Sequence, residues 1–167
     1  DSLQHLVEEK STLIKDLRKT GTFIVNADDP LAFDMQKKTD RPVISFGESH
    51  GATIQSSHQS INYSEASDVP TGISFKVKIG NATIPVHMRW VFGSNHMYAA
   101  LAALSVAYSQ KFELLTAAKA LEAYEVPNGR MRLIDGVRGS FIIDDSYNAS
   151  PQATEGAIDT LGNIKAT

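Results

Sequence analysis

The sequence predicts an α/β fold with a mostly parallel sheet, flanking helices and a small antiparallel insertion. Short apolar runs that are followed by helical patterns, as at residues 22–25 and 141–143, are typical of strand–helix units in a parallel sheet. Residues 73–88 instead alternate apolar and polar side chains around the turn Gly80-Asn81, which predicts an antiparallel hairpin. We therefore expect both kinds of strand pairing in this chain.

The elements of the first half follow from local patterns. A stripe of apolar residues predicts a helix over 2–19, and a buried strand is expected at 22–26. Pro30 suits the first turn of a helix that runs to about residue 38, and residues 42–47 predict a second buried strand. A further strand within 52–63 would join the hairpin, while residues 56–68 resemble a surface loop or an irregular edge.

The second half begins with an alanine-rich helix over about 93–109, whose small side chains allow close packing on a sheet. The N-terminus of such a helix is a natural seat for an anion or a nucleotide. Another helix is expected over 114–124. We divide the chain into a domain over 1–126, a hinge over 127–135, and the start of a second domain over 136–167.

Composition restricts the classes of protein. The chain has 167 residues, 42% of them hydrophobic, which suffices for a sizeable core. A net charge of −3 with scattered Lys and Arg argues against a nucleic-acid surface or a polybasic membrane patch. No apolar run could span a bilayer, and the absence of cysteine excludes disulfides and thiolate metal sites. We expect a cytoplasmic protein without membrane insertion, although the chain lacks an initiating Met, so a missing targeting sequence has little weight.

Two pairs of carboxylates follow predicted strands. Asp28–Asp29 and Asp144–Asp145 each stand where an apolar run ends, and ligands of open α/β sheets bind at the carboxyl ends of strands. The two pairs therefore predict one ligand-facing edge of a shared sheet. The structural alternative is that they form turns and helix caps, which Asp and Asn favour whatever the function. Ser150 and Pro151 predict such a helix start after the second pair.

Lys10 lies on the apolar stripe of the first helix, with Leu3 and Leu6. Desolvating an ammonium group is costly, so a lysine on a buried face needs an explanation. The alternative is that its stem packs while its amine stays in water. Phosphate-loop, dinucleotide-binding and nucleophile-elbow motifs are absent from the sequence. The residues by themselves therefore indicate an α/β domain with a polar cleft and no specified reaction.

Four segments together resemble the Mur ligases, ATP-dependent amide-forming enzymes of peptidoglycan precursor synthesis. They are Glu9-Lys10, residues 26–30 (Asn-Ala-Asp-Asp-Pro), the helix opening over 93–103, and Gly129-Arg130 followed by residues 144–151 (Asp-Asp-Ser-Tyr-Asn-Ala-Ser-Pro). The last segment is most similar to the branch that adds D-Ala-D-Ala to UDP-N-acetylmuramoyl-tripeptide. The resemblance implies the late part of a Rossmann-like central ATPase domain and the start of a second Rossmann-like domain. The family's phosphate loop would precede residue 1.

The resemblance implies a metal-binding role for Lys10. In the family the matching lysine is carbamylated by CO2, which converts an ammonium into an anion that helps to hold Mg2+. A buried amine with a lowered pKa is the form that reacts with CO2, which would explain a lysine on an apolar face.

The resemblance also implies nucleotide contacts. Asn95 and His96 fall where relatives place an Asn and a His near adenine, although here their order is swapped, and Ala99 replaces an Asn. Arg130 aligns with a hinge arginine that reaches the phosphates. Asp145 aligns with an acidic residue on the ribose, and Tyr147 and Asn148 lie beside it in the sequence.

The implied reaction is formation of an acyl phosphate with ATP, followed by attack of the amine of D-Ala-D-Ala. Lys10 and Arg130 are the expected catalytic residues, the full-length enzyme is expected to be a monomer, and the chain alone is expected not to turn over. Two alternatives stay open: a related ligase that adds another amino acid, and a non-catalytic nucleotide-binding module of the same fold.

Overall fold

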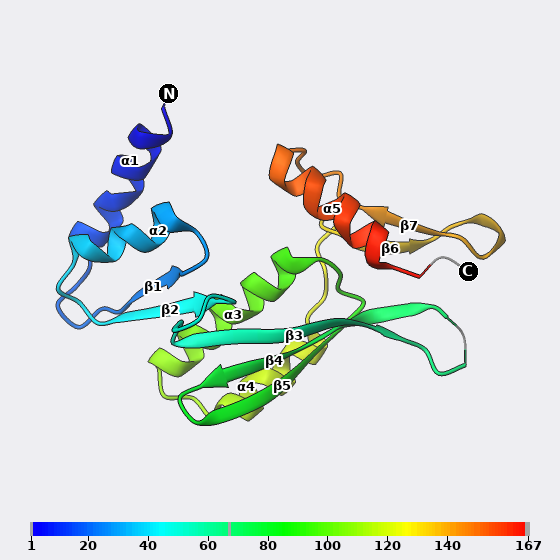
Figure 1. Ribbon diagram of the computed structural model, residues 1–167, viewed down its shortest axis with the longest axis horizontal. Coiled ribbons are helices and arrows are strands. Elements are labelled where there is room, and N and C mark those ends of the chain that lie inside the picture. Colours follow the sequence, from blue (N-terminus) through cyan, green and yellow to red (C-terminus); the bar gives the residue numbers. More distant parts are fainter. Residues whose placement is uncertain (1, 67, 166–167) are drawn as a thin grey trace.

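The computed structural model describes residues 2–66 and 68–165, which form a large and a small sheet (Figure 1). The large sheet has the order β1 (Phe23–Asn26), β2 (Val43–Gly47), β3 (Ile54–Tyr63), β4 (Pro70–Ile79) and β5 (Ala82–Arg89). The small sheet pairs β6 (Arg132–Asp135) with β7 (Phe141–Asp144) in antiparallel fashion. The α/β fold class is confirmed.

The large sheet is mixed rather than mostly parallel. β1 and β3 both pair with β2 in parallel, whereas β3–β4 and β4–β5 are antiparallel. The expected hairpin and the expected strand within 52–63 are confirmed. Of the two expectations for 56–68, a loop or an irregular edge, the irregular edge describes the part up to Tyr63, because β3 continues to that residue with shifts in register and pairs only with β4 beyond Gln55. Ile54 and Ser56 on one face of β3 are buried, and the ladder with β4 satisfies the backbone of this polar segment.

The described residues also form five α-helices: α1 (Leu3–Lys15), α2 (Pro30–Asp34), α3 (Ser94–Ser109), α4 (Leu114–Ala120) and α5 (Pro151–Asn163). The 3-10 turns Met35–Lys38 and Leu121–Ala123 extend α2 and α4. None of the described helices is long and apolar enough to cross a membrane. α1 ends four residues before the expected boundary at residue 19, because the chain turns at Gly21, whose amide donates to the Arg18 carbonyl.

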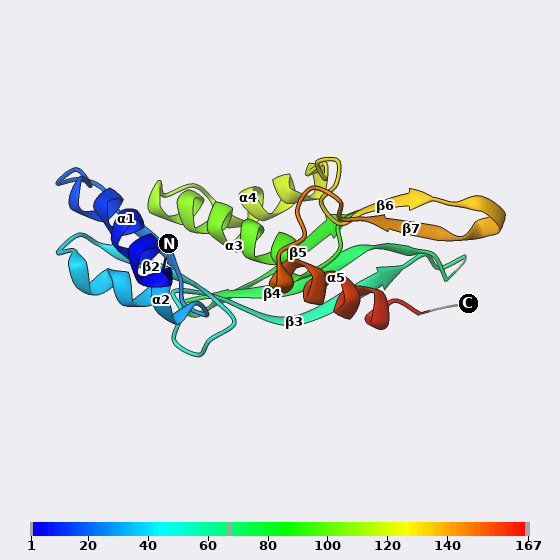
Figure 2. The ribbon, with the colours of Figure 1, turned by 90° about the horizontal axis from the view of Figure 1, so that it is seen from above.

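The main core lies between α3, α4 and the large sheet. Both helices cover the same side of the sheet (Figure 2). Met97, Leu101 and Leu104 of α3 pack in one cluster with buried side chains of the sheet such as Ile54 and Val77. Burial of this apolar surface is the main term that fixes α3, and with it the side chains at its N-terminus, over the sheet.

β7 does not match the buried strand expected at 141–143. Phe141 and Ile142 are 38% and 55% exposed, because β7 pairs with β6 in a two-stranded ribbon and not with the large sheet. The prediction that both Asp pairs share one sheet edge is therefore wrong. β6 lies entirely within the expected hinge over 127–135, since it spans Arg132–Asp135.

Substitution of Gly72 tests the β4–β5 contact. Gly72 has a φ of +142°, and a Cβ there would overlap the Met88 carbonyl oxygen of the neighbouring strand. We expect Gly72→Ala to lower the free energy of unfolding by about 1–3 kcal/mol. The matched control is Gly156→Ala on α5, where a Cβ meets nothing within 4 Å and alanine favours the helix. Denaturant unfolding that ranks the two variants the other way would contradict this account.

Candidate functional site

Asp28 links the ends of β1 and β2 to α3. Its Oδ2 accepts hydrogen bonds from the Glu48 amide at 2.6 Å and from the Tyr98 hydroxyl at 2.9 Å, and its Oδ1 accepts from the Ser49 amide at 2.8 Å. Gly47 permits this approach, since a Cβ there would lie 2.5 Å from Asp28 Oδ2. The carboxylate therefore holds the turn after β2 against the helix that covers the sheet.

The neighbouring Asp29 caps α2, and its Oδ1 accepts from the amides of Leu31 and Ala32. For Asp28–Asp29 the structural alternative of turn and cap is thus confirmed.

The hydrogen bonds around Asp28 set its ionisation. Burial by itself would raise the pKa of Asp28, but hydrogen bonds from Ser49, the Glu48 amide and Tyr98 outweigh burial and hold the pKa below its ordinary value of 3.8. Burial and the bond to Asp28 raise the pKa of Tyr98 well above its usual range. The pair therefore consists of an ionised carboxylate and a neutral phenol.

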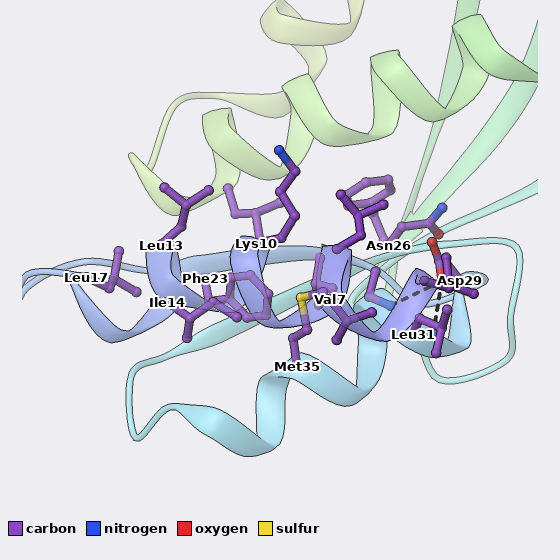
Figure 3. A pocket seen from close by; sticks show the side chains of 16 residues that line it. Val7, Lys10, Leu13, Ile14, Leu17, Phe23, Asn26, Asp29, Leu31 and Met35 are labelled. Atoms are coloured by element: carbon purple, nitrogen blue, oxygen red, sulfur yellow. Dashed lines mark hydrogen bonds between the residues drawn. The ribbon is translucent and has the colours of Figure 1, made fainter. Parts of the chain in front are cut away.

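Lys10 lines an open, largely apolar groove of about 580 Å³ between α1, β1 and α2 (Figure 3). The amine end of Lys10 points away from the apolar side chains of Phe23 and Met35. Lys10 is exposed, and so is Leu13 on the same stripe, at 71%. The stripe is covered only in part, since Ile14 is 5% exposed, and the expectation that Lys10 lies on a buried face is wrong for this structure.

A second cluster surrounds the turn that carries Arg130. Asp144 Oδ2 accepts from the Gly129 amide and Asp145 Oδ1 from the Met131 amide, both at 3.1 Å. The Tyr147 amide donates to the Gly129 carbonyl, also at 3.1 Å. The carboxylates of Asp144 and Asp145 thus accept hydrogen bonds from the backbone amides on both sides of Arg130.

Gly129 and Asp144 are adapted to this contact. Gly129 has a φ of +73°, and a Cβ there would lie 3.0 Å from the Tyr147 amide nitrogen. The Ser146 hydroxyl and amide donate to Asp144 Oδ1 and, with the Gly129 amide, lower the pKa of Asp144. Asp144 is therefore an ionised acceptor for backbone amides.

The side chain of Arg130 is exposed and stacks on Tyr147, with its guanidinium carbon 3.9 Å from the ring centroid. Asn148 and Asn95 are exposed as well. Arg130 thus presents a cation that is fixed at its stem and open at its head.

His96 contacts the same turn from α3. Its ring is buried, and its Nε2 lies 3.0 Å from the Arg130 carbonyl oxygen. Tyr124, which the sequence patterns did not indicate, packs against His96 with ring centroids 5.8 Å apart.

The structure brings five of the predicted residues to one area and separates Lys10 from them. Arg130, Asp145 and Tyr147 are joined by the contacts above, and Asn95 and His96 lie in the first turn of α3 next to the turn. Lys10 lies on α1 at one end of the molecule, away from the hinge segment (Figures 1 and 2). Within residues 2–66 and 68–165 no group of three His, Asp or Glu could hold a metal ion.

The family model of the Mur ligase middle domain matches residues 1–107. This chain belongs to the Mur ligase family. It is 28% identical over 167 residues to UDP-N-acetylmuramoyl-tripeptide--D-alanyl-D-alanine ligase of Bacillus subtilis strain 168, a match that covers 98% of this chain and 33% of that protein. It is 25% identical over 146 residues to UDP-N-acetylmuramoyl-L-alanyl-D-glutamate--2,6-diaminopimelate ligase of Geobacillus thermodenitrificans, covering 87% of this chain and 28% of that protein.

The fold agrees with these matches. MurF ligase from Thermotoga maritima in complex with ADP superposes with a TM-score of 0.81 at 20% identity, covering 99% of this chain and 36% of that one. The Mur ligase fold predicted from the sequence is confirmed. The chain spans about a third of the length of the curated relatives it matches.

Replacement of Asp28 tests its role. A folded-state pKa below the unfolded value means that the ionised carboxylate stabilises the fold above the unfolded pKa, and that this contribution is lost as pH falls through the folded pKa. We expect Asp28→Asn to destabilise the protein at neutral pH and to differ less from the wild type at about pH 3. The control is Asp34→Asn, an exposed residue paired with Lys37. Urea unfolding with an equal gap at both pH values would contradict the assignment.

Proposed function

We propose that this chain is part of an ATP-dependent ligase that adds D-Ala-D-Ala to UDP-N-acetylmuramoyl-tripeptide during peptidoglycan precursor synthesis. Membership of the Mur ligase family supports the reaction class, and the name of the Bacillus subtilis relative supports the substrates. The observation that carries the proposal is the convergence of Arg130, Asp145 and Tyr147 beside the N-terminus of α3.

The hinge cluster fits a nucleotide. Arg130 offers an exposed guanidinium for phosphate oxygens, and its stacking on Tyr147 restricts its conformations. Among the described residues, the hydrogen bond to Asp145 uses Oδ1, so Oδ2 remains an acceptor for a ribose hydroxyl. The N-cap residue of α3 is Gly93, which has no side chain to cap the helix, so the first amides of α3 can bind an anion or the polar edge of a base together with Asn95. Asn148 follows Tyr147 on the same exposed loop.

The residues of this chain act by positioning and by charge. ATP, when bound, supplies the γ-phosphoryl group that converts the tripeptide carboxylate into an acyl phosphate, from which the amine of D-Ala-D-Ala displaces phosphate. Arg130 neutralises and orients phosphate oxygens, and the turn at Gly129 brings it to the nucleotide when the hinge over 127–135 closes. We assign the sequence on either side of this hinge to the central and the following domain.

The described residues do not by themselves assemble a Mg2+ site. Asp29 caps α2, Asp28 accepts three hydrogen bonds, and no group of three acidic or histidine residues in the described part of the chain could hold a metal ion. A carbamate at Lys10 stays a separate prediction, which chemical rescue tests.

A related ligase for a different amine is the second candidate function, because the Geobacillus relative is named as a ligase for 2,6-diaminopimelate. By their names, the two relatives differ both in the UDP-linked peptide that they extend and in the amine that they add. A non-catalytic module of the same fold would accept none.

Phosphate release by the full-length protein separates these candidates. With ATP, Mg2+ and UDP-N-acetylmuramoyl-tripeptide, we expect release that depends on D-Ala-D-Ala. We expect no release with diaminopimelate, whether the acceptor is the tripeptide or UDP-N-acetylmuramoyl-L-alanyl-D-glutamate. The control is residues 1–167 alone, which should be inactive. Release with another amine would support the related ligase, and silence with every amine would support the module.

Lys10→Ala in the full-length protein is expected to lower phosphate release by more than about 10-fold, and short carboxylic acids should restore part of it by replacing the lost anion. The matched control is Lys15→Ala, at an exposed position on the same helix. Unchanged activity in Lys10→Ala would refute the carbamate.

A further inference from the structure

We propose that His96 is a positioning residue that sets Arg130 for the nucleotide, and that it does not itself read the base. This inference rests on the proposed nucleotide site and concerns how that site is built. With Asn at position 95 and His at position 96, the histidine bonds the Arg130 carbonyl and the asparagine stays exposed.

The first argument is the burial and orientation of His96. Its side chain is 7% exposed, whereas Asn95 beside it is exposed. Nε2 lies 3.0 Å from the Arg130 carbonyl oxygen, and a carbonyl only accepts, so Nε2 donates. The other ring nitrogen, Nδ1, lies 3.5 Å from the Tyr124 hydroxyl. Both polar atoms of the ring therefore face protein groups, which leaves Asn95 as the residue of the pair that can reach a ligand.

The second argument is where the bond attaches. The amides on either side of Arg130, those of Gly129 and Met131, are held by Asp144 and Asp145. The carbonyl of Arg130 itself is held by His96. The turn is thus tied to the end of β7 through its amides and to α3 through its carbonyl.

The third argument is the rigidity of the two anchors. α3 is fixed by core residues such as Met97 and Leu101, which are fully buried directly after His96 and one turn further on. Met131 is also buried and lies next to Gly93, whose added Cβ would come 3.3 Å from Met131 Cε. Because Arg130 projects from between these contacts, its guanidinium takes a defined position relative to the first amides of α3 when the hinge is closed and the contacts are made.

An asparagine at position 96 would be too short to reproduce this contact. Glutamine has a terminal amide that reaches about as far as Nε2 and can donate to the same carbonyl. Comparing His, Asn and Gln at position 96 therefore distinguishes the effect of the hydrogen bond to the Arg130 carbonyl from the effect of packing of the imidazole ring.

The test measures the affinity of the full-length protein for ADP by titration calorimetry. We expect His96→Leu and His96→Asn to weaken ADP binding by roughly 3- to 10-fold, the range for one lost neutral hydrogen bond, and His96→Gln to stay within about 2-fold of the wild type. Equal losses in His96→Gln and His96→Leu would overturn the proposal, since ring packing would then be the cause.

A double-mutant cycle shows whether His96 acts through Arg130. If it does, the double variant His96→Leu/Arg130→Ala binds ADP no more weakly than Arg130→Ala alone. Additive losses would mean that His96 contacts ADP independently, and an unaffected Arg130→Ala would mean that there is nothing to position. Either result overturns the proposal.

Hydrogen exchange provides a readout that does not depend on the nucleotide. His96→Leu should speed exchange of the Gly129 and Met131 amides and leave that of the buried α3 residue Leu101 unchanged, whereas His96→Gln should change neither. Faster exchange throughout α3 would indicate a folding defect and contradict a local role.

The double-mutant cycle and the phosphate-release assay test separate claims, so the role of His96 and the ligase assignment can fail independently. Dipeptide-dependent phosphate release with additive losses in ADP binding leaves the ligase standing and overturns the role of His96. Absence of release with a non-additive cycle overturns the ligase and supports the role of His96.

Discussion

The grip of Asp144 and Asp145 on the backbone amides of Gly129 and Met131 is the contact on which the candidate site depends. Ionised carboxylates are strong acceptors for amides, and two of them in succession can hold both ends of a three-residue turn. Gly129 makes the approach of Tyr147 possible, and Arg130 stands between the gripped amides. Without this contact Tyr147 would lose its place under the guanidinium, and the side chain of Arg130 would lose its stacking partner.

Asp28, which follows β1, also binds the backbone of a neighbouring turn through its carboxylate. There a single carboxylate accepts two amides from the turn after β2 and a hydroxyl from α3. In both places a side chain that ends a strand satisfies the backbone of a neighbouring turn, which would otherwise have to rely on water. The groups differ in what they leave free: Asp28 is used on both oxygens, whereas the hinge cluster exposes the head of Arg130.

α3 connects the two places. In its N-terminal part, Tyr98 donates a hydrogen bond to Asp28 and His96 contacts the turn that carries Arg130. Its buried face belongs to the main core. The packing energy of the core therefore also determines the geometry at the hinge. This arrangement explains physically why we expect replacement of His96, which is buried and does not contact the nucleotide, to weaken ADP binding.

The sequence by itself determined the local elements: the hairpin over 73–88, the α3 helix, and the caps at Asp29 and Ser150 follow from periodicity and capping within a few residues. Short motifs in the sequence, with their spacing, also indicated the Mur ligase family. Only the tertiary structure decided that β7 pairs with β6 outside the large sheet, that Lys10 is exposed, and that His96 faces the Arg130 carbonyl. The reason is that strand partners and burial depend on residues far apart in the chain, and a contact across 34 positions leaves no trace in either local pattern.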